Sequence, residues 1–205
     1  MPQKHLIIGL TGNIGVGKSA ALAQLRRLGA RVIDADKVAH QVMMPGGLAY
    51  DAVVRAFGPG ILARDGSIDR SKLAAIVFTD SEQLARLERI VHPAVEQAIK
   101  AEIARAQEPV IVIEAIKLLE GRLRPLCDEI WVISASEATQ LARLMRYRSM
   151  SEAEARRRLA SQSPQSWKEQ QADVVIRNDG GLDELEAQVT RAWQAMLARH
   201  QDNNQ

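Results

Sequence analysis

The chain has 205 residues, of which 46% are hydrophobic and 25% are charged, and these proportions exclude global disorder. The length suits one domain, or one domain that carries a sizeable insertion. The formal net charge of +2 gives no indication of a general nucleic-acid binder, and no apolar run reaches the roughly 18 residues needed to span a membrane, so we expect neither as a partner.

The first predicted elements are a strand, a glycine-rich turn, a helix and a second strand. The apolar run at 5–10 predicts a short buried strand. Leu22 and Leu25 lie on one face of a helix predicted over 18–28, which Gly29 ends, and a strand resumes at 31–33. Strand, helix and strand in so short a stretch form the unit of a parallel α/β sheet.

The turn after the first strand carries the full motif G-x-x-x-x-G-K-S. Its glycines let the backbone wrap closely around an oligophosphate, and the N-terminus of the following helix adds a field that favours an anion. A turn that merely connects strand to helix is the alternative, but an apolar strand before the motif and an amphipathic helix after it are the context of a phosphate-binding loop. Lys18 is expected to reach the β- and γ-phosphates, and the Ser19 hydroxyl to bind Mg²⁺. The predicted ATP contacts in this loop are Gly12, Asn13, Ile14, Gly15, Val16, Gly17, Lys18, Ser19 and Ala20.

The rest of the chain predicts further strands and two helical stretches. Apolar residues at helical spacing fill residues 44–108, too much chain for one crossover helix, so we interpret it as an insertion. Buried strands are expected at 110–113, 129–133 and 174–176. We predict an α/β fold with a P-loop NTPase-type five-stranded parallel sheet flanked by helices. Its predicted parts are a core of 1–43, 109–136 and 172–200, an inserted helical substrate domain at 44–108, and a helical lid at 137–171.

Carboxylates follow two of the predicted strands. Asp34 and Asp36 come directly after the second strand, where a carboxylate can help an acceptor hydroxyl; equally, one of them can cap the helix predicted at 37–43. Glu114 ends the third strand, where it either holds a Mg²⁺-bound water or is an ordinary strand-end charge. The residue types leave these alternatives open.

Arginines gather in the predicted lid, at Arg143, Arg146, Arg148 and 156–158. Such side chains either fold over a triphosphate and stabilise its oxygens during transfer, or cover a solvated helix face. In the insertion, Pro93 predicts the first turn of a helix, with His92 before it as a capping or core residue.

The loop motif indicates that a nucleotide phosphate is bound, and the rest of the chain limits which classes of nucleotide-binding protein are possible. The guanine-reading string N-K-x-D of GTPases does not occur, and the chain is too short for a large motor ATPase. A small phosphotransferase fits, because its core holds the phosphoryl donor while helical insertions hold the acceptor and exclude water.

Six strings along the chain stand in a specific order and spacing. They are IGLTGNIGVGKS at 8–19, VIDADKVAHQV at 32–42, IVHP at 90–93, KLLE at 117–120, SEAEARRRLASQSP at 151–164 and ADVVIRNDGG at 172–181. Together they resemble the dephospho-CoA kinase family over nearly the whole chain, from about residue 6 to residue 193. The resemblance implies transfer of the ATP γ-phosphate to the ribose 3′-hydroxyl of dephospho-CoA, with Mg²⁺. It also implies a helical CoA-side domain and a lid.

The resemblance also implies roles for single residues. Asp36 matches the family's proposed base and, with Asp34, is expected to contact the acceptor. His92 matches the histidine of the family's H-P motif near the acceptor, and Asn178 falls in the segment near the adenine, so both are predicted binding residues.

Three positions depart from the family's pattern. Ala20 replaces a threonine, which removes one hydroxyl near the α-phosphate. Lys117 is new, and is either an extra phosphate contact or a surface residue. Tyr147 stands where a lid arginine is expected, so we assign that catalytic role to its neighbours, Arg146 and Arg148.

Two other functions remain alternatives at this stage. One is a P-loop kinase for another small molecule, such as a nucleoside, shikimate or gluconate, which would share the donor half and differ in the insertion. The other is a nucleotide-sensing module that has lost transfer. We expect ATP and dephospho-CoA as the small-molecule partners and a monomer, although a homo-oligomer is also compatible. The single Cys127 and the lack of a signal-peptide pattern predict a cytoplasmic protein.

Overall fold

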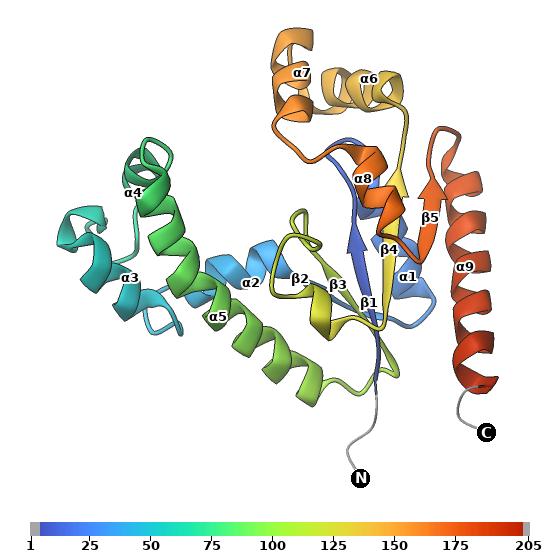
Figure 1. Cartoon of the computed structure of the whole chain (residues 1–205), viewed down its shortest axis with the longest axis horizontal. Coiled ribbons are helices and arrows are strands. Elements are labelled where there is room, and N and C mark those ends of the chain that lie inside the picture. The colour runs from blue at the N-terminus through green and yellow to red at the C-terminus, as the bar shows by residue number, and fades with distance from the viewer. Residues whose placement is uncertain (1–4, 203–205) are drawn as a thin grey trace. The chain divides into compact units, whose positions relative to one another are not determined.

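A computed structural model describes residues 5–202 and contains a five-stranded, all-parallel sheet with the strand order β2-β3-β1-β4-β5 (Figure 1). The predicted fold class is therefore confirmed. The strands are β1 (Leu6–Thr11), β2 (Arg31–Asp34), β3 (Val110–Glu114), β4 (Glu129–Ser134) and β5 (Val174–Arg177). The helices are α1 (Lys18–Arg27), α2 (Ala35–Val42), α3 (Tyr50–Phe57), α4 (Arg70–Val77), α5 (Ser81–Arg105), α6 (Glu137–Arg148), α7 (Glu152–Ala160), α8 (Gln165–Gln170) and α9 (Leu182–Asp202), with short 3₁₀ turns at Pro59–Ile61 and Arg124–Leu126.

Contacts divide the chain into two compact units, which are residues 1–32 with 107–205, and residues 33–106. The first unit contains β1, β3, β4 and β5, the phosphate-loop motif and the helices from α6 onward. The second contains α2 to α5, and the predicted insertion lies within it except for its last two residues. No helix in residues 5–202 is long and apolar enough to cross a membrane.

The central strand of the sheet is β1, because it pairs with β3 on one side and β4 on the other. Its register sets Leu10 opposite Glu114 of β3 and Thr11 opposite Val132 of β4. The chain therefore leaves β1 at the carboxyl edge of the sheet, where ligands of parallel α/β proteins bind.

One face of the sheet is covered by α1 and α9, which also pack against each other. Apolar side chains of α9, Val189, Trp193 and Met196 among them, are buried there against Trp131 of β4. Burying several such large side chains is the main source of stability in this layer.

The last helix also completes the exposed edge of the sheet. In Figure 1, α9 runs beside β5, the edge strand. The Gln188 side chain accepts a hydrogen bond from the Arg177 N–H at 3.2 Å and donates one to the Arg177 carbonyl at 2.8 Å. A side chain thus pairs with both backbone groups of a strand residue.

In the second unit, the 25-residue helix α5 packs against α2, α3 and α4. Pro93 lies inside α5, so the predicted helix start at this residue is wrong, and so is the expectation that His92 caps a helix or lies in a core, because it is exposed. Proline lacks the N–H that would bond four residues back, but the buried Val91, Ala94 and Val95 hold the helix together across this gap.

The stretch predicted as a helical lid at 137–171 contains three helices, α6, α7 and α8. Ser149, at the end of α6, adopts a left-handed backbone with φ of 50°, and α7 begins three residues later. The Ser151 side chain accepts a hydrogen bond from the Glu154 N–H and so caps α7.

Candidate active site

The loop between β1 and α1 follows the central strand and contains three glycines with positive φ. Two of these positions admit no side chain. A Cβ on Gly12 would lie 2.3 Å from the Ile133 carbonyl oxygen of β4, and a Cβ on Gly17 would lie 2.2 Å from the Asn178 amide nitrogen. At Gly12 the loop therefore approaches the backbone of β4 closely, and at Gly17 it packs against the Asn178 side chain.

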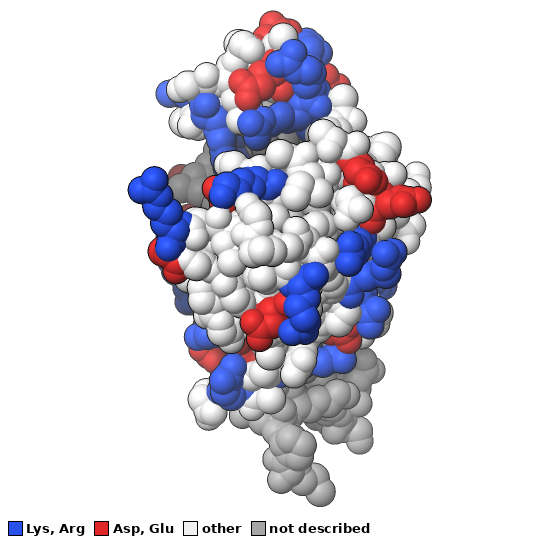
Figure 2. All heavy atoms as spheres, turned by 90° about the vertical axis from the view of Figure 1, so that its left-hand side faces the viewer, with Lys and Arg blue, Asp and Glu red and all other residues white. Residues whose placement is uncertain are grey.

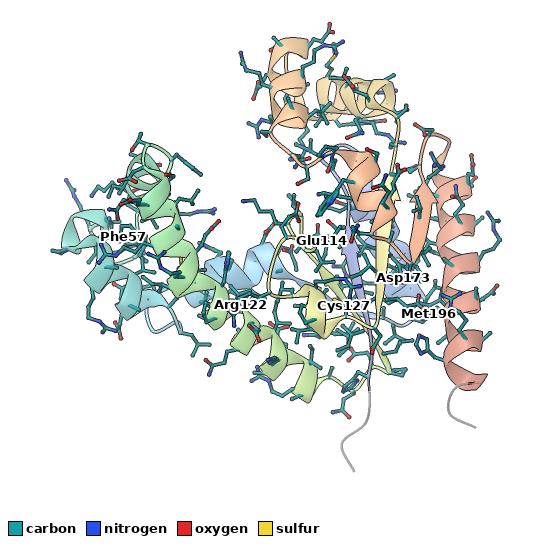
Figure 3. The ribbon with its side chains drawn as sticks, viewed as in Figure 1. Phe57, Glu114, Arg122, Cys127, Asp173 and Met196 are labelled. Carbon is teal, nitrogen blue, oxygen red and sulfur yellow. The ribbon has the colours of Figure 1, made fainter. Side chains whose placement is uncertain are left out.

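Lys18 begins α1 and turns its side chain back over the loop. Its ammonium donates a hydrogen bond to the Gly12 carbonyl at 2.8 Å and lies 3.9 Å from Oε1 of Glu114. Both side chains are nearly nine-tenths buried, at 13% and 11% exposure. In Figure 3, Glu114 is seen at the end of β3. This places one positive and one negative group at the mouth of the loop.

Magnesium is implied by the loop type, and the residues present fit it. The Ser19 hydroxyl and the Glu114 carboxylate supply the hard oxygen ligands that Mg²⁺ prefers. Within the described residues, no group of three or more His, Cys, Asp or Glu side chains could hold a metal ion. The donor set thus suits an ion that takes most of its ligands from nucleotide phosphates and water.

Asn178 follows β5 and forms hydrogen bonds with the loop and with Arg143. Its amide nitrogen donates to the Val16 carbonyl at 2.7 Å, and its oxygen accepts from Arg143 at 3.3 Å. Arg143 also donates to the Val16 carbonyl at 3.4 Å. Arg143, in the predicted lid, thus contacts the loop, whereas the predicted Arg146 and Arg148 are exposed near the end of α6.

Two further arginines of the predicted lid, Arg156 and Arg158, pair with acidic neighbours. Arg156 contacts Glu152 and Glu137, and Arg158 contacts Glu154. Figure 2 shows blue and red side chains intermingled at the top of the view, where α7 lies. Exposed pairs of this kind contribute little to stability, about 0.3–0.5 kcal/mol each in a helix.

A buried lysine that no sequence pattern indicated lies close to the loop. Lys168 on α8 is only 1% exposed, and its ammonium donates to the Ile116 carbonyl at 2.9 Å. Burial lowers the pKa of Lys168, and nearby Lys18 lowers it further, whereas Glu120 opposes the shift. The Ile116 carbonyl also accepts from Thr11, so Lys168 fixes the backbone after β3 beside the start of the loop.

The two aspartates after β2 have different local roles in the second unit. Asp34 caps α2, because its carboxylate accepts the Lys37 N–H at 3.0 Å and also lies 3.3 Å from the Lys37 ammonium. Asp36 lies in the first turn of the same helix and is exposed. Lys117, in the first unit, is exposed as well.

A parallel sheet in this order, with a phosphate loop after its central strand, defines a P-loop kinase. The shikimate kinase from Bacteroides thetaiotaomicron shares this fold, with a TM-score of 0.51 at 15% identity, covering 93% of this chain and 98% of that one.

The family description CoaE, dephospho-CoA kinase, matches residues 6–184, and the chain belongs to this family. The dephospho-CoA kinase of Geobacter sulfurreducens is 44% identical over 190 residues, which cover 91% of this chain and 96% of that protein. The crystal structure of TT1252 from Thermus thermophilus superimposes with a TM-score of 0.81 at 34% identity and covers 96% of this chain and 98% of that one. The activity of the chain is that of its family, the ATP-dependent phosphorylation of dephospho-CoA that completes coenzyme A biosynthesis.

Proposed function

We propose that the chain transfers the γ-phosphoryl group of ATP to the ribose 3′-hydroxyl of dephospho-CoA by the residues named below. The observation that carries this assignment is the pairing of the buried Lys18 ammonium with the Gly12 carbonyl and Glu114 at the mouth of the loop. A buried ammonium beside a ring of backbone N–H groups is suited to a polyphosphate anion.

The donor half of the site is the loop with the start of α1. The N–H groups of Gly15, Val16, Gly17 and Ser19 have no protein acceptor within the described residues, so they are open to phosphate oxygens. Lys18 exchanges its bond to the Gly12 carbonyl for the β- and γ-phosphates and neutralises charge that builds up during transfer. Asn178, bonded under Val16, supports the loop on the side where we place the adenine.

Ser19 and Glu114 would hold Mg²⁺ together with the nucleotide. The ion, when bound, screens the phosphate charge. Glu114 keeps its carboxylate beside Lys18 at 3.9 Å, and this contact fixes the positions of both groups before the nucleotide arrives.

The acceptor half is assigned to Asp36, with Asp34, His92 and Lys117 as contacts for dephospho-CoA. Asp34 is committed to capping α2, which supports Asp36 as the base. In the proposed step, the Asp36 carboxylate accepts the proton of the 3′-hydroxyl. At the same time the 3′-oxygen of the ribose bonds to the γ-phosphorus, and the bond between the γ-phosphorus and the bridging oxygen of ADP breaks. Arg146 and Arg148 are proposed to stabilise the oxygens of the group in transfer.

An acceptor panel tests this function. The purified protein is incubated with ATP and Mg²⁺ and with dephospho-CoA, shikimate, gluconate or a nucleoside, and ADP and phosphorylated product are quantified. We expect product with dephospho-CoA and none with the others. Turnover of another acceptor alone would reject the substrate, and nucleotide binding without any product would favour a sensing module.

Lys18→Ala tests the donor half. Losing the phosphate clamp is expected to lower kcat/KM by about 100- to 1,000-fold, as when a charged or polar group that stabilises a transition state is removed. Wild-type turnover in this variant would refute the role of Lys18.

A cytoplasmic location and a monomeric state stay predictions.

A further inference from the structure

The segment 162–168, which joins α7 to α8 and includes most of α8, crosses the beginning of the phosphate loop. We call it the connector. Two glutamines of the connector bond backbone N–H groups of the loop. The Gln162 side-chain oxygen accepts the Ile14 N–H at 2.8 Å, and the Gln165 side-chain oxygen accepts the Asn13 N–H at 3.2 Å.

Asn13 is held a second time by the connector. Its side-chain amide donates to the Ser163 carbonyl at 3.1 Å, and the residue is 5% exposed. Three hydrogen bonds therefore join two consecutive loop residues, Asn13 and Ile14, to connector residues that are more than 140 positions away in sequence. These contacts fix both the backbone and the side chain at the second position of the motif.

The contacts divide the loop into two halves. The N–H groups of Asn13 and Ile14 are bonded to glutamine side chains, whereas those of Gly15, Val16, Gly17 and Ser19 have no protein acceptor in the described part of the chain. An amide oxygen is a neutral acceptor, so it satisfies these donors without placing a negative charge beside a triphosphate.

The connector is itself anchored to the sheet. The Gln165 amide nitrogen donates to the Ile133 carbonyl of β4 at 3.4 Å, and the buried Lys168 holds the Ile116 carbonyl after β3 at 2.9 Å. The connector is therefore fixed to the carboxyl ends of strands on both sides of β1, which gives the glutamines a rigid support.

We propose that Gln162 and Gln165 are positioning residues for the phosphates of ATP. By holding the N–H groups of Asn13 and Ile14, they fix the backbone so that the later N–H groups converge on one anion. They touch the loop and act through it. The inference rests on the proposed role of the loop as the ATP site.

The test measures ATP binding in Gln162→Met and Gln165→Met, which keep the side-chain length and remove the acceptor. Gln170→Met is the matched control, because Gln170 is exposed at the end of α8. Calorimetry gives the Kd for ATP, steady-state kinetics give the KM for dephospho-CoA, and hydrogen exchange followed by NMR reports the Ile14 and Asn13 amides.

We expect each of the two variants to weaken ATP binding about three- to ten-fold, the size expected from one lost hydrogen bond, and to leave the KM for dephospho-CoA unchanged. Gln162→Met should speed exchange of the Ile14 amide, and Gln165→Met that of Asn13. The control should match the wild type. A lower Tm with unchanged ATP affinity would show a purely structural role, and tighter ATP binding would show that glutamine competes with phosphate; either result overturns the proposal.

Gln162→Glu covers the case in which the methionine variants do not fold. Its carboxylate still accepts the Ile14 N–H, so that amide should stay protected, while the added negative charge should weaken ATP binding in a salt-dependent way. Wild-type affinity in Gln162→Glu would count against the inference. If Lys18→Ala binds ATP as the wild type does, the proposed role of the loop as the ATP site fails; if only the glutamine variants do, the inference alone fails.

Discussion

Lys18 at the start of α1 and Glu114 at the end of β3 lie side by side, with 3.9 Å between the ammonium and the carboxylate. Both are largely buried, and a buried charge is tolerated when it has a partner. The Gly12 carbonyl is the second acceptor of the ammonium, which keeps it over the loop and away from solvent.

Glu114→Gln should raise the Mg²⁺ concentration needed for half-maximal activity. The variant keeps the size of the side chain and removes the negative charge that both the ion and Lys18 require. We expect a loss of about 10- to 100-fold in apparent metal affinity, measured by titrating Mg²⁺ at saturating ATP. An unchanged Mg²⁺ dependence would show that Glu114 interacts with Lys18 and does not bind the ion.

Separate substitutions of Asp34 and Asp36, at the start of α2, should distinguish an effect on catalysis from an effect on stability. Asp36→Asn is expected to lower kcat by about 100- to 10,000-fold with ATP affinity and Tm retained, because only the proton acceptor is lost. Asp34→Ala removes the helix cap and should cost about 0.5–2 kcal/mol in the free energy of unfolding. Urea unfolding and steady-state kinetics on both variants check this. A stability loss in Asp36→Asn with normal turnover would reverse the assignment.

Glu129 should make stability sensitive to acid. Burial by itself raises the pKa of Glu129, but hydrogen bonds from Trp131 and Arg199 outweigh it and lower the pKa below the ordinary 4.5. Between the folded and unfolded pKa values the unfolded chain binds more protons, so falling pH favours unfolding. The stabilisation is complete above 4.5 and is lost as the pH falls through the folded pKa.

The measurement compares urea unfolding of the wild type and Glu129→Gln at neutral pH and at several acid values. The wild type should be the more stable at neutral pH, and the difference should shrink below 4.5. A difference independent of pH would show that Glu129 acts by packing and not by its charge.

Cys127 should be inert in the folded protein. Burial raises the pKa of its thiol to about 12, and the sulfur lies 3.4 Å from the Leu123 carbonyl. Only the thiolate reacts with disulfide reagents, so labelling at mildly alkaline pH should proceed at the rate of unfolding. Rapid labelling under native conditions would contradict the buried position.

Local signals were sufficient to predict the elements around the loop. The loop motif and the apolar strands at 5–10 and 31–33 each occupy one continuous stretch, so their residues report directly on β1, α1 and β2. Pro93 was misassigned because proline is common at helix starts, while the packing that tolerates it inside α5 comes from residues elsewhere in the fold.

The connector could not be predicted in this way. Gln162 and Gln165 are ordinary polar residues in sequence, and their partners at Ile14 and Asn13 lie about 150 positions away. The one available signal was the string at 151–164, which carries Gln162 without indicating what it touches. The roles of Asp34 and Asp36 could likewise not be distinguished from the sequence, since either residue precedes the predicted helix closely enough to cap it.

The bidentate contact of Gln188 with Arg177 has a consequence for how the molecule behaves at high concentration. A sheet edge that exposes free N–H and C=O groups invites another chain to add a strand and start aggregation. At Arg177 both groups are already taken by a side chain from α9, and β5 has only four residues. The final helix therefore shields the flank of the sheet from self-association, in addition to covering the core.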